Sequence, residues 1–332
     1  MTWFDGALAD LPEPDATARN ALLGRAAHVL RPSGALQRLD EVAAHVAAWQ
    51  STTSPCVVRP AVLVFAADHG VVGGGVSAYP ASVTAEMMRA VESGRATVNA
   101  MARAVGASVT VLDVGVGDPT GDIRFEPALD GGRFERVVQV AVGAVDGAVA
   151  DGADMFVLGE LGIGNTTAAA AVSAAVLGGA VAAWVGRGSG VDDEGLARKR
   201  EAVATARARV GPVADPIEIL RQVGGAELVA VAAACVRARH HRIPVVLDGY
   251  VATAAVLAVH DARPGGLDHC LAGHVSAEPG HRRLLDHLGL DPLLDLGMRL
   301  GEGSGALAAI PLVRMACPVV TDVPTFDEWF DA

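Results

Sequence analysis

Three glycine-rich loops carry most of the residues in this sequence that could take part in chemistry. The first, Gly159 to Thr167, follows a hydrophobic run and places Glu160, Asn165 and Thr166 among glycines. Glycines let backbone amides approach an anion closely, and Asn and Thr side chains can cap the following helix or donate to phosphate oxygens. The loop is either a phosphate cradle or an ordinary strand-to-helix turn. It lacks the Gly-Lys-Ser/Thr ending of a P-loop.

A second glycine-rich loop, Gly186 to Gly190, precedes a helix that begins with acidic residues and carries Lys199 and Arg200. Alternating glycines are a weak motif alone. Lys199 has two interpretations: a solvated cation on the helix surface, or a phosphate ligand if the loop places an anion beside it. Adjacent side chains on a helix point in different directions, so at most one of the two basic residues faces a shared site.

The third loop runs from Arg299 to Ala306 and places Glu302 among three glycines just before an apolar helix. The carboxylate could simply interact with the positive end of the helix dipole. Alternatively it is a general base, because loss of hydration in a tight loop raises a carboxyl pKa toward the working range.

Further acidic residues lie where predicted strands end. Asp68 and His69 follow one strand, and Asp248 follows another. His69 has no second histidine at ligand spacing beside it, which favours a structural role over a metal site. The sequence predicts no metal and no cofactor.

Short hydrophobic runs that end in glycine or an acidic residue alternate with Ala-rich helical stretches from residue 61 onward. The predicted strands are 61–66, 108–114, 154–158, 181–185 and 244–247. Strands without polar alternation are buried on both faces, which predicts a three-layer α/β fold with a parallel sheet and helices on both faces. Ligands of such sheets bind beyond the carboxyl ends of the strands, where the glycine-rich loops lie.

Both ends of the chain are predicted to be helical. Apolar residues recur at spacings of three and four between Leu36 and Trp49, and the pattern turns helical again after about residue 290. We therefore expect a small helical domain made from 1–60 and 290–332, and a large α/β domain at 61–289.

Composition excludes several classes of protein. The chain has 332 residues and a formal net charge of -12, which argues against non-specific binding to nucleic acid or anionic membranes. The N-terminus is acidic where a secretory signal is basic. The uncharged stretch 168–185 is interrupted by two glycines and predicts a buried helix followed by a buried strand, not a membrane span. The four cysteines are widely spaced, and a reducing cytoplasm is the expected location.

Taken together, several stretches resemble one family, the nicotinate-nucleotide:dimethylbenzimidazole phosphoribosyltransferases, which activate the lower ligand of cobalamin. The similar stretches occur in family order at 66–71, 75–80 with Val83-Thr84, 159–167, 276–281 and 300–306. The resemblance implies a Rossmann-like large domain, a small domain drawn from both chain ends, and a homodimer. It also implies transfer of the phosphoribosyl group from nicotinate mononucleotide to a benzimidazole nitrogen with inversion at the anomeric carbon, giving α-ribazole 5′-phosphate and nicotinate.

The resemblance further implies roles for individual residues. Glu302 matches the general base that takes a proton from the attacking benzimidazole. Positive charge that develops on the ribose calls for a nearby anion, for which Glu160 is the first candidate and Asp248 the second. The residues expected to bind the nucleotide and its phosphate are Gly162, Gly164, Asn165, Thr166, Gly186, Gly188, Lys199, Ser276 and Arg299. Those expected around the acceptor base are Ser77, Tyr79, Glu86, Met298 and Leu300.

Glu86 is the clearest departure from the family pattern, which usually has Gln beside the base-binding pocket. A carboxylate cannot donate a hydrogen bond as an amide does. Glu86 faces the acceptor ring, pairs with Arg89 or Arg95, or lies outward on a helix surface. These alternatives leave open whether the acceptor is an azole or a phenol.

Two rival functions remain. A nucleotide-binding module without transferase activity would lack the general base, which this chain keeps as Glu302. A dinucleotide oxidoreductase would have a glycine fingerprint where this chain has Asp68-His69-Gly70.

Overall fold

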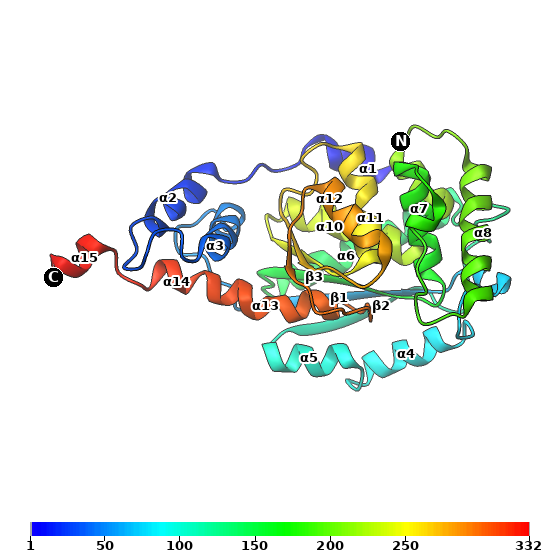
Figure 1. Cartoon of the computed structure of the whole chain (residues 1–332), viewed down its shortest axis with the longest axis horizontal. Helices are drawn as coiled ribbons and strands as arrows, with labels where there is room; N and C mark the ends of the chain where they lie inside the picture. Colours follow the sequence, from blue (N-terminus) through cyan, green and yellow to red (C-terminus); the bar gives the residue numbers. More distant parts are fainter. Residues whose placement is uncertain (1, 332) are drawn as a thin grey trace.

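The computed structural model describes residues 2–331 and contains a six-stranded sheet (Figure 1). All neighbouring strands are parallel, in the order β2-β1-β3-β4-β5-β6. The strands are β1 (Pro60–Ala67), β2 (Ser108–Gly115), β3 (Met155–Leu161), β4 (Val245–Leu247), β5 (Cys270–His274) and β6 (Pro292–Leu294). The strand order reverses between β1 and β3, and the carboxyl ends at such a switch point are the usual place of a ligand.

Helices precede, connect and follow these strands. Those before β1 are α1 (Trp3–Ala9), α2 (Ala16–Ala26) and α3 (Gln37–Gln50). Those between β1 and β3 are η1 (Gly70–Gly74), α4 (Val83–Glu92), α5 (Thr97–Val105) and α6 (Gly131–Ala150). Between β3 and β4 lie α7 (Asn165–Leu177), η2 (Val181–Ala183), α8 (Asp193–Val210), α9 (Pro216–Val223) and α10 (Ala226–His240). The remaining helices are α11 (Tyr250–Ala262), α12 (Pro279–Leu288), α13 (Ser304–Ala316), α14 (Pro318–Thr321) and α15 (Phe326–Phe330).

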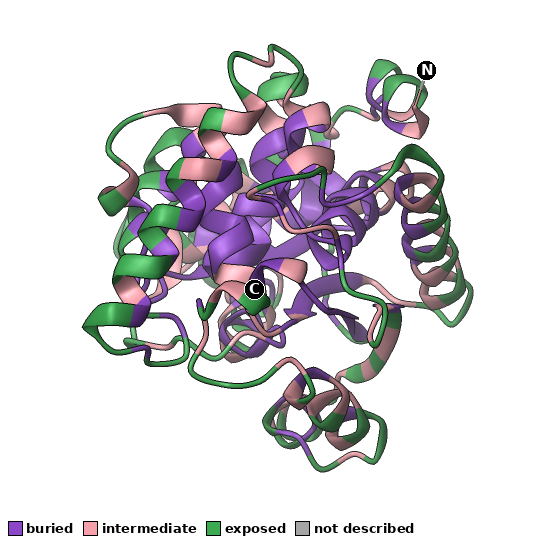
Figure 2. Cartoon of the chain, turned by 90° about the vertical axis from the view of Figure 1, so that its right-hand side faces the viewer, coloured by how far each residue is buried: buried purple, intermediate pink, exposed green. Residues whose placement is uncertain are grey.

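Alternate residues of the central strands pack into two separate hydrophobic cores. Leu63 and Phe65 of β1 belong to the core that α6, α7, α10 and α11 cover. Val62 and Val64 point to the other face, which α3, α5 and α13 cover. Successive side chains of a strand point to opposite faces, so an apolar residue at every position buries both. Figure 2 shows the buried residues gathered on the sheet and on the inward sides of the helices. The predicted three-layer α/β fold is confirmed.

The predicted strand at 181–185 is wrong. Val181–Ala183 forms the short helix η2, and Trp184 donates from its indole nitrogen to the Gly178 carbonyl at 2.8 Å. The segment is thereby held as a turn after α7, and β4 pairs with β3 instead. The sequence also did not predict β5 or β6. Cys270–His274 contains no β-branched residue, and Pro292–Leu294 is only three residues long.

Helix α2 lies beside the C-terminal helices α14 and α15, at the left of Figure 1. Arg25 of α2 donates to the Val320 carbonyl at 2.9 Å and pairs with Glu328 of α15 at 2.8 Å. The first helix lies elsewhere, because Phe4 of α1 packs against Phe134 of α6. The predicted domain boundaries remain a prediction.

A continuous apolar stretch, Ser304–Thr321, has the length and composition of a membrane-crossing helix. In the structure 56% of this stretch is buried. Ala306, Ile310 and Val313 lie in the core with α3 and α5. A helix that is apolar on all sides is typical of a protein core as well as of a membrane. We interpret this stretch as a core helix.

Candidate active site

A cavity lies at the carboxyl edge of the sheet, where the loops after β3, β4 and β5 meet the loop before α13. It brings together residues of all three glycine-rich loops, although they are far apart in the sequence. The predicted site residues that line it are Ser77, Glu160, Gly162, Gly164, Asn165, Thr166, Gly188, Lys199, Ser276, Arg299 and Leu300.

Glu160 lies near the end of β3 and is buried in the wall of this cavity. The side-chain amide of Asn165, at the start of α7, donates to its Oε2. Burial raises the pKa of the Glu160 carboxyl well above its usual range, and the nearby Asp248, Glu227 and Glu302 raise it further. Burial thus disfavours the ionised form of this carboxyl. A bound cation would lower this pKa and favour the carboxylate.

Glu302 lies in the loop before α13, directly after the cavity residue Gly301. Its φ of 62° is in the left-handed region, and its amide donates to the Glu160 carbonyl at 3.1 Å. The side chain is 2% exposed, and its Oε2 has no hydrogen-bond partner. Burial raises the pKa of the carboxyl, a hydrogen bond from the Val98 backbone lowers it, and Asp248 raises it. A buried carboxylate with a free oxygen and a raised pKa is suited to general-base catalysis.

Asp248, after β4, holds this loop in place and does not line the cavity. Its Oδ1 accepts hydrogen bonds from the amides of Gly305 at 2.7 Å and Ala306 at 3.0 Å, and its Oδ2 accepts one from Gly303 at 3.1 Å. These amides belong to the start of α13, where they have no partner within the helix. Both oxygens of Asp248 therefore position the Glu302 loop. The anion role predicted for Asp248 stays a prediction.

Lys199 is buried in the cavity wall and does not lie on a solvated helix face. Its Nζ donates to Thr166 Oγ1 at 2.9 Å. Burial lowers the pKa of the Lys199 ammonium to about 8, against the opposing effect of Glu278. An ammonium group has three donors, and the bond to Thr166 uses one of them. The rest are available to an anion in the cavity.

Glu278 is a cavity residue that the sequence analysis did not single out. Its Oε1 accepts a hydrogen bond from the Gly188 amide at 3.0 Å. A Cβ at Gly186 would lie 2.2 Å from Glu278 Oε2, and a Cβ at Gly188 would lie 3.0 Å from Lys199 Nζ. The two glycines therefore make room for a carboxylate and an ammonium group. Gly188 lines the cavity, but its amide, which was predicted to bind the nucleotide, donates to Glu278 in this structure. Gly186, also predicted to bind the nucleotide, does not line the cavity.

Two histidines lie beside the loop that follows β5. His281 Nδ1 accepts a hydrogen bond from the Ser276 amide at 2.8 Å. Burial lowers the pKa of His281 to about 3, so its ring is neutral and holds Ser276 in place. His274 lines the cavity, and its Nε2 lies 3.6 Å from Asp248 Oδ1.

A family model described as "Phosphoribosyltransferase" matches residues 11–329, almost the whole chain. The chain belongs to this phosphoribosyltransferase family.

Relatives of this phosphoribosyltransferase match over nearly their full length. Two proteins named nicotinate-nucleotide--dimethylbenzimidazole phosphoribosyltransferase are similar to it. The one from Methylocella silvestris is 48% identical over 97% of this chain and 93% of its own. The one from Cereibacter sphaeroides is 46% identical over 99% of this chain and 96% of its own. The crystal structure of CobT from Thermus thermophilus superposes with a TM-score of 0.91 at 44% identity, covering 95% of this chain and 98% of the other.

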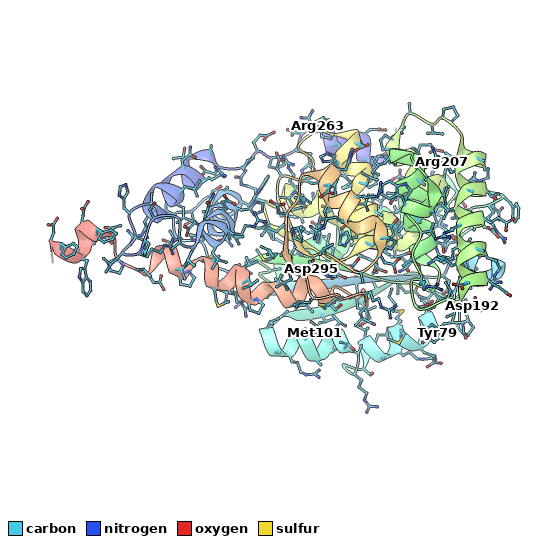
Figure 3. All side chains as sticks on the ribbon, viewed as in Figure 1. Tyr79, Met101, Asp192, Arg207, Arg263 and Asp295 are labelled. Carbon is cyan, nitrogen blue, oxygen red and sulfur yellow. The ribbon has the colours of Figure 1, made fainter. Side chains whose placement is uncertain are left out.

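Three residues predicted to surround the acceptor base do not line the cavity of this phosphoribosyltransferase. Tyr79 is 51% exposed and lies toward the same end of the molecule as Asp192 (Figure 3). The backbone carbonyl of Met298 accepts a hydrogen bond from the Ala277 amide. The Glu86 side chain is 68% exposed and pairs with Arg89, which is the pairing alternative of the sequence analysis. Helix α4 presents Glu86 to solvent because its buried residues, Thr84 and Val91, lie on the opposite face.

We expect Glu86→Gln to leave acceptor preference unchanged within about twofold, because an exposed ion pair contributes little. The measurement is the ratio of kcat/KM for an azole that carries an N–H or O–H donor to kcat/KM for dimethylbenzimidazole. A shift of that ratio toward dimethylbenzimidazole would place Glu86 against the acceptor ring after all. Arg89→Gln is the matched control, since it removes the other partner of the same pair.

His69 forms a buried pair with Glu227. The two atoms in contact, His69 Nε2 and Glu227 Oε1, are 2.6 Å apart, and both side chains are fully buried. A Cβ at Gly162 would lie 3.2 Å from the same His69 nitrogen. The pair therefore packs against the first glycine-rich loop of this phosphoribosyltransferase, on the side of Gly162, and supports that loop.

Within residues 2–331, two groups of side chains have the donor atoms for a metal ion. They are Cys235 with His269 and Cys270, which are buried, and His260 with Asp261 and His287 nearer the surface. Neither group lines the cavity. In the buried group, His269 Nε2 lies 2.9 Å from the Cys235 carbonyl oxygen, and that hydrogen bond competes with a metal.

Proposed function

We propose that this protein transfers the phosphoribosyl group of nicotinate mononucleotide to a benzimidazole-type base, giving α-ribazole 5′-phosphate and nicotinate in the assembly of the cobalamin nucleotide loop. Glu302 carries the proposal most directly, because it is a buried carboxylate with an unpartnered oxygen beside the cavity. The names of full-length relatives at 46–48% identity support the same reaction.

The substrate fits the cavity by charge. The phosphate group pairs with Lys199 and with the Thr166 hydroxyl, which share a hydrogen bond in the wall. Arg299 lines the same cavity and donates to the Gly188 carbonyl at 3.1 Å, so its guanidinium adds positive charge at this end. The start of α7 contributes backbone amides that favour an anion.

The chemical step is a displacement at the anomeric carbon. One nitrogen of the acceptor forms a bond to C1′, while the C1′–N bond to nicotinate breaks and its electron pair returns to the pyridine ring. The N–H proton on the second acceptor nitrogen passes to the free oxygen of Glu302. Attack from the face opposite nicotinate inverts the anomeric configuration. General-base assistance of this kind contributes about 100- to 10,000-fold.

Glu160 complements the positive charge of this reaction. Nicotinate mononucleotide carries a cationic pyridinium ring, and the positive charge moves to the ribose in the transition state. Burial and neighbouring carboxylates raise the pKa of the Glu160 carboxyl in the free protein. A cationic substrate shifts that pKa back down and favours the carboxylate, which is the stabilising anion.

We further propose that the protein is a cytoplasmic homodimer. The support for a dimer is a group of exposed aromatic side chains on α15, namely Phe326, Trp329 and Phe330, which are 44%, 59% and 75% exposed. All four cysteines are free thiols, and three are buried, which suits a reducing compartment. Light scattering of the purified protein tests the dimer directly.

The experiment that tests the function is a product assay. Purified protein is incubated with nicotinate mononucleotide and each of a panel of benzimidazoles, purines and phenols, and the products are identified by mass. We expect α-ribazole 5′-phosphate and free nicotinate with dimethylbenzimidazole. Nucleotide binding without any product would support a binding module and contradict the proposal.

A further inference from the structure

Glu278 remains without a role in the reaction described above, although the fold builds a place for it. Its side chain lies in the cavity wall and is 9% exposed. The glycine at 186 leaves space for its Oε2, and the Gly188 amide binds its Oε1. Yet Oε2 is buried without a hydrogen-bond partner. An ionised carboxylate offers about four acceptor positions, and only one is used here.

A buried carboxylate oxygen without a partner is costly, so a ligand that supplies a donor would be favoured there. The phosphate group is unsuited, because it is an anion and offers mainly acceptors. Lys199 lies close enough to Glu278 to be affected by its charge, so the carboxylate stands beside the phosphate end of the cavity. A donor on the part of the nucleotide next to its phosphate would satisfy this oxygen.

Nicotinate mononucleotide has few donors to offer. Its carboxylate, its ring oxygen and its phosphate are acceptors, and its pyridinium nitrogen carries no hydrogen. The two ribose hydroxyls are the only neutral donors in the molecule. A carboxylate that accepts from ribose hydroxyls is a common arrangement in nucleotide-binding sites.

We infer that Glu278 accepts hydrogen bonds from the ribose 2′- and 3′-hydroxyls, and so makes the enzyme selective for ribonucleotides over deoxyribonucleotides. The inference rests on the proposed function only for the identity of the nucleotide. Glu160 is less suited to this role because its Oε2 already accepts from Asn165 and its raised pKa favours the neutral form. Glu302 serves the acceptor base.

The test is a binding cycle between protein variants and nucleotides, measured by calorimetry. Wild type and Glu278→Gln are each titrated with nicotinate mononucleotide and with its 2′-deoxy and 3′-deoxy analogues. The amide keeps the shape of the side chain and can still accept from Gly188, but replaces the free acceptor oxygen. Binding is measured instead of turnover, because removing the 2′-hydroxyl also changes the reactivity of the glycosidic bond.

We expect removal of at least one hydroxyl to weaken binding to wild type by about 10- to 100-fold, the usual effect of a hydrogen bond to a charged group. The same removal should weaken binding to Glu278→Gln by less than about threefold. Lys199→Met is the matched control: it should bind all three nucleotides more weakly but keep the discrimination between them. Melting temperatures of all variants verify that they fold.

Two results would overturn the inference. Wild type could bind the deoxy analogues as tightly as the ribonucleotide, or Glu278→Gln could weaken all three nucleotides equally, which would mean that Glu278 only shapes the Gly188 loop. Hydroxyl-dependent binding without product in the mass assay would instead contradict the proposed function and leave Glu278 as assigned. Failure of wild type to bind nicotinate mononucleotide at all would overturn both.

Discussion

Glu302→Gln is expected to lower kcat by about 100- to 10,000-fold, the usual range for a positioned general base. The amide has the shape of the carboxyl but cannot take the proton of the acceptor. Nucleotide affinity should change little, because Glu302 lies outside the residues that line the phosphate end. Single-turnover product formation and calorimetric titration with nicotinate mononucleotide measure the two effects separately.

The pH profile gives an independent check on the same residue. Burial raises the pKa of Glu302, and a base must be deprotonated to act. Activity of the wild type should therefore fall as the pH decreases through this raised pKa, at a higher pH than for an ordinary carboxyl. Exchange of the exposed Glu92 for Gln serves as the control and should change neither kcat nor the profile. Near-normal kcat in Glu302→Gln would remove this residue from the mechanism.

Lys199→Met should weaken binding of nicotinate mononucleotide by about 10- to 100-fold, since it removes a charge-assisted contact to phosphate. Met fills the same buried space, so the fold should persist. Binding of nicotinate riboside, which lacks the phosphate, should change by less than about threefold. An equal loss for nucleotide and riboside would refute the assignment of Lys199 to phosphate.

The same contact should depend on pH. Lys199 is charged below its pKa and neutral above it, and burial lowers that pKa from 10.5 to about 8. Affinity for the nucleotide should therefore decrease as the pH rises through about 8 in wild type. Lys199→Met should show no such decrease, and neither protein should show it with the riboside. Nucleotide affinity in wild type that stays constant well above this pKa would contradict this account of the burial of Lys199.

Much of the site could be predicted because its residues sit in loops with a distinctive local composition. Glycine, a short polar side chain and a strand end can be recognised without knowing what lies across the cavity. Glu160 and Asn165 share one loop and do contact each other. The sheet was predictable where strands such as β1 are apolar at every position.

Other features depend on contacts between distant segments. Glu278 meets Gly188 across 90 residues of sequence, so nothing local distinguishes it from an ordinary acidic residue. From sequence, Asp248 cannot be told apart from a catalytic carboxylate. Only its hydrogen bonds from three amides at the start of α13 reveal that it positions this loop. Val181–Ala183 has strand-like composition, but the indole of Trp184 fixes a turn there.

The left-handed backbone of Glu302 has a consequence for attempts to make this enzyme more heat-resistant. The left-handed conformation of Glu302 destabilises the folded state by about 1–2 kcal/mol for a residue with a side chain, whereas glycine adopts it freely. Selection for thermal tolerance alone would therefore favour glycine at position 302, between two glycines that are already there. On the proposed mechanism, the resulting protein would be more stable but inactive. Stability and catalysis are opposed at this single position, and any engineering library should hold it constant.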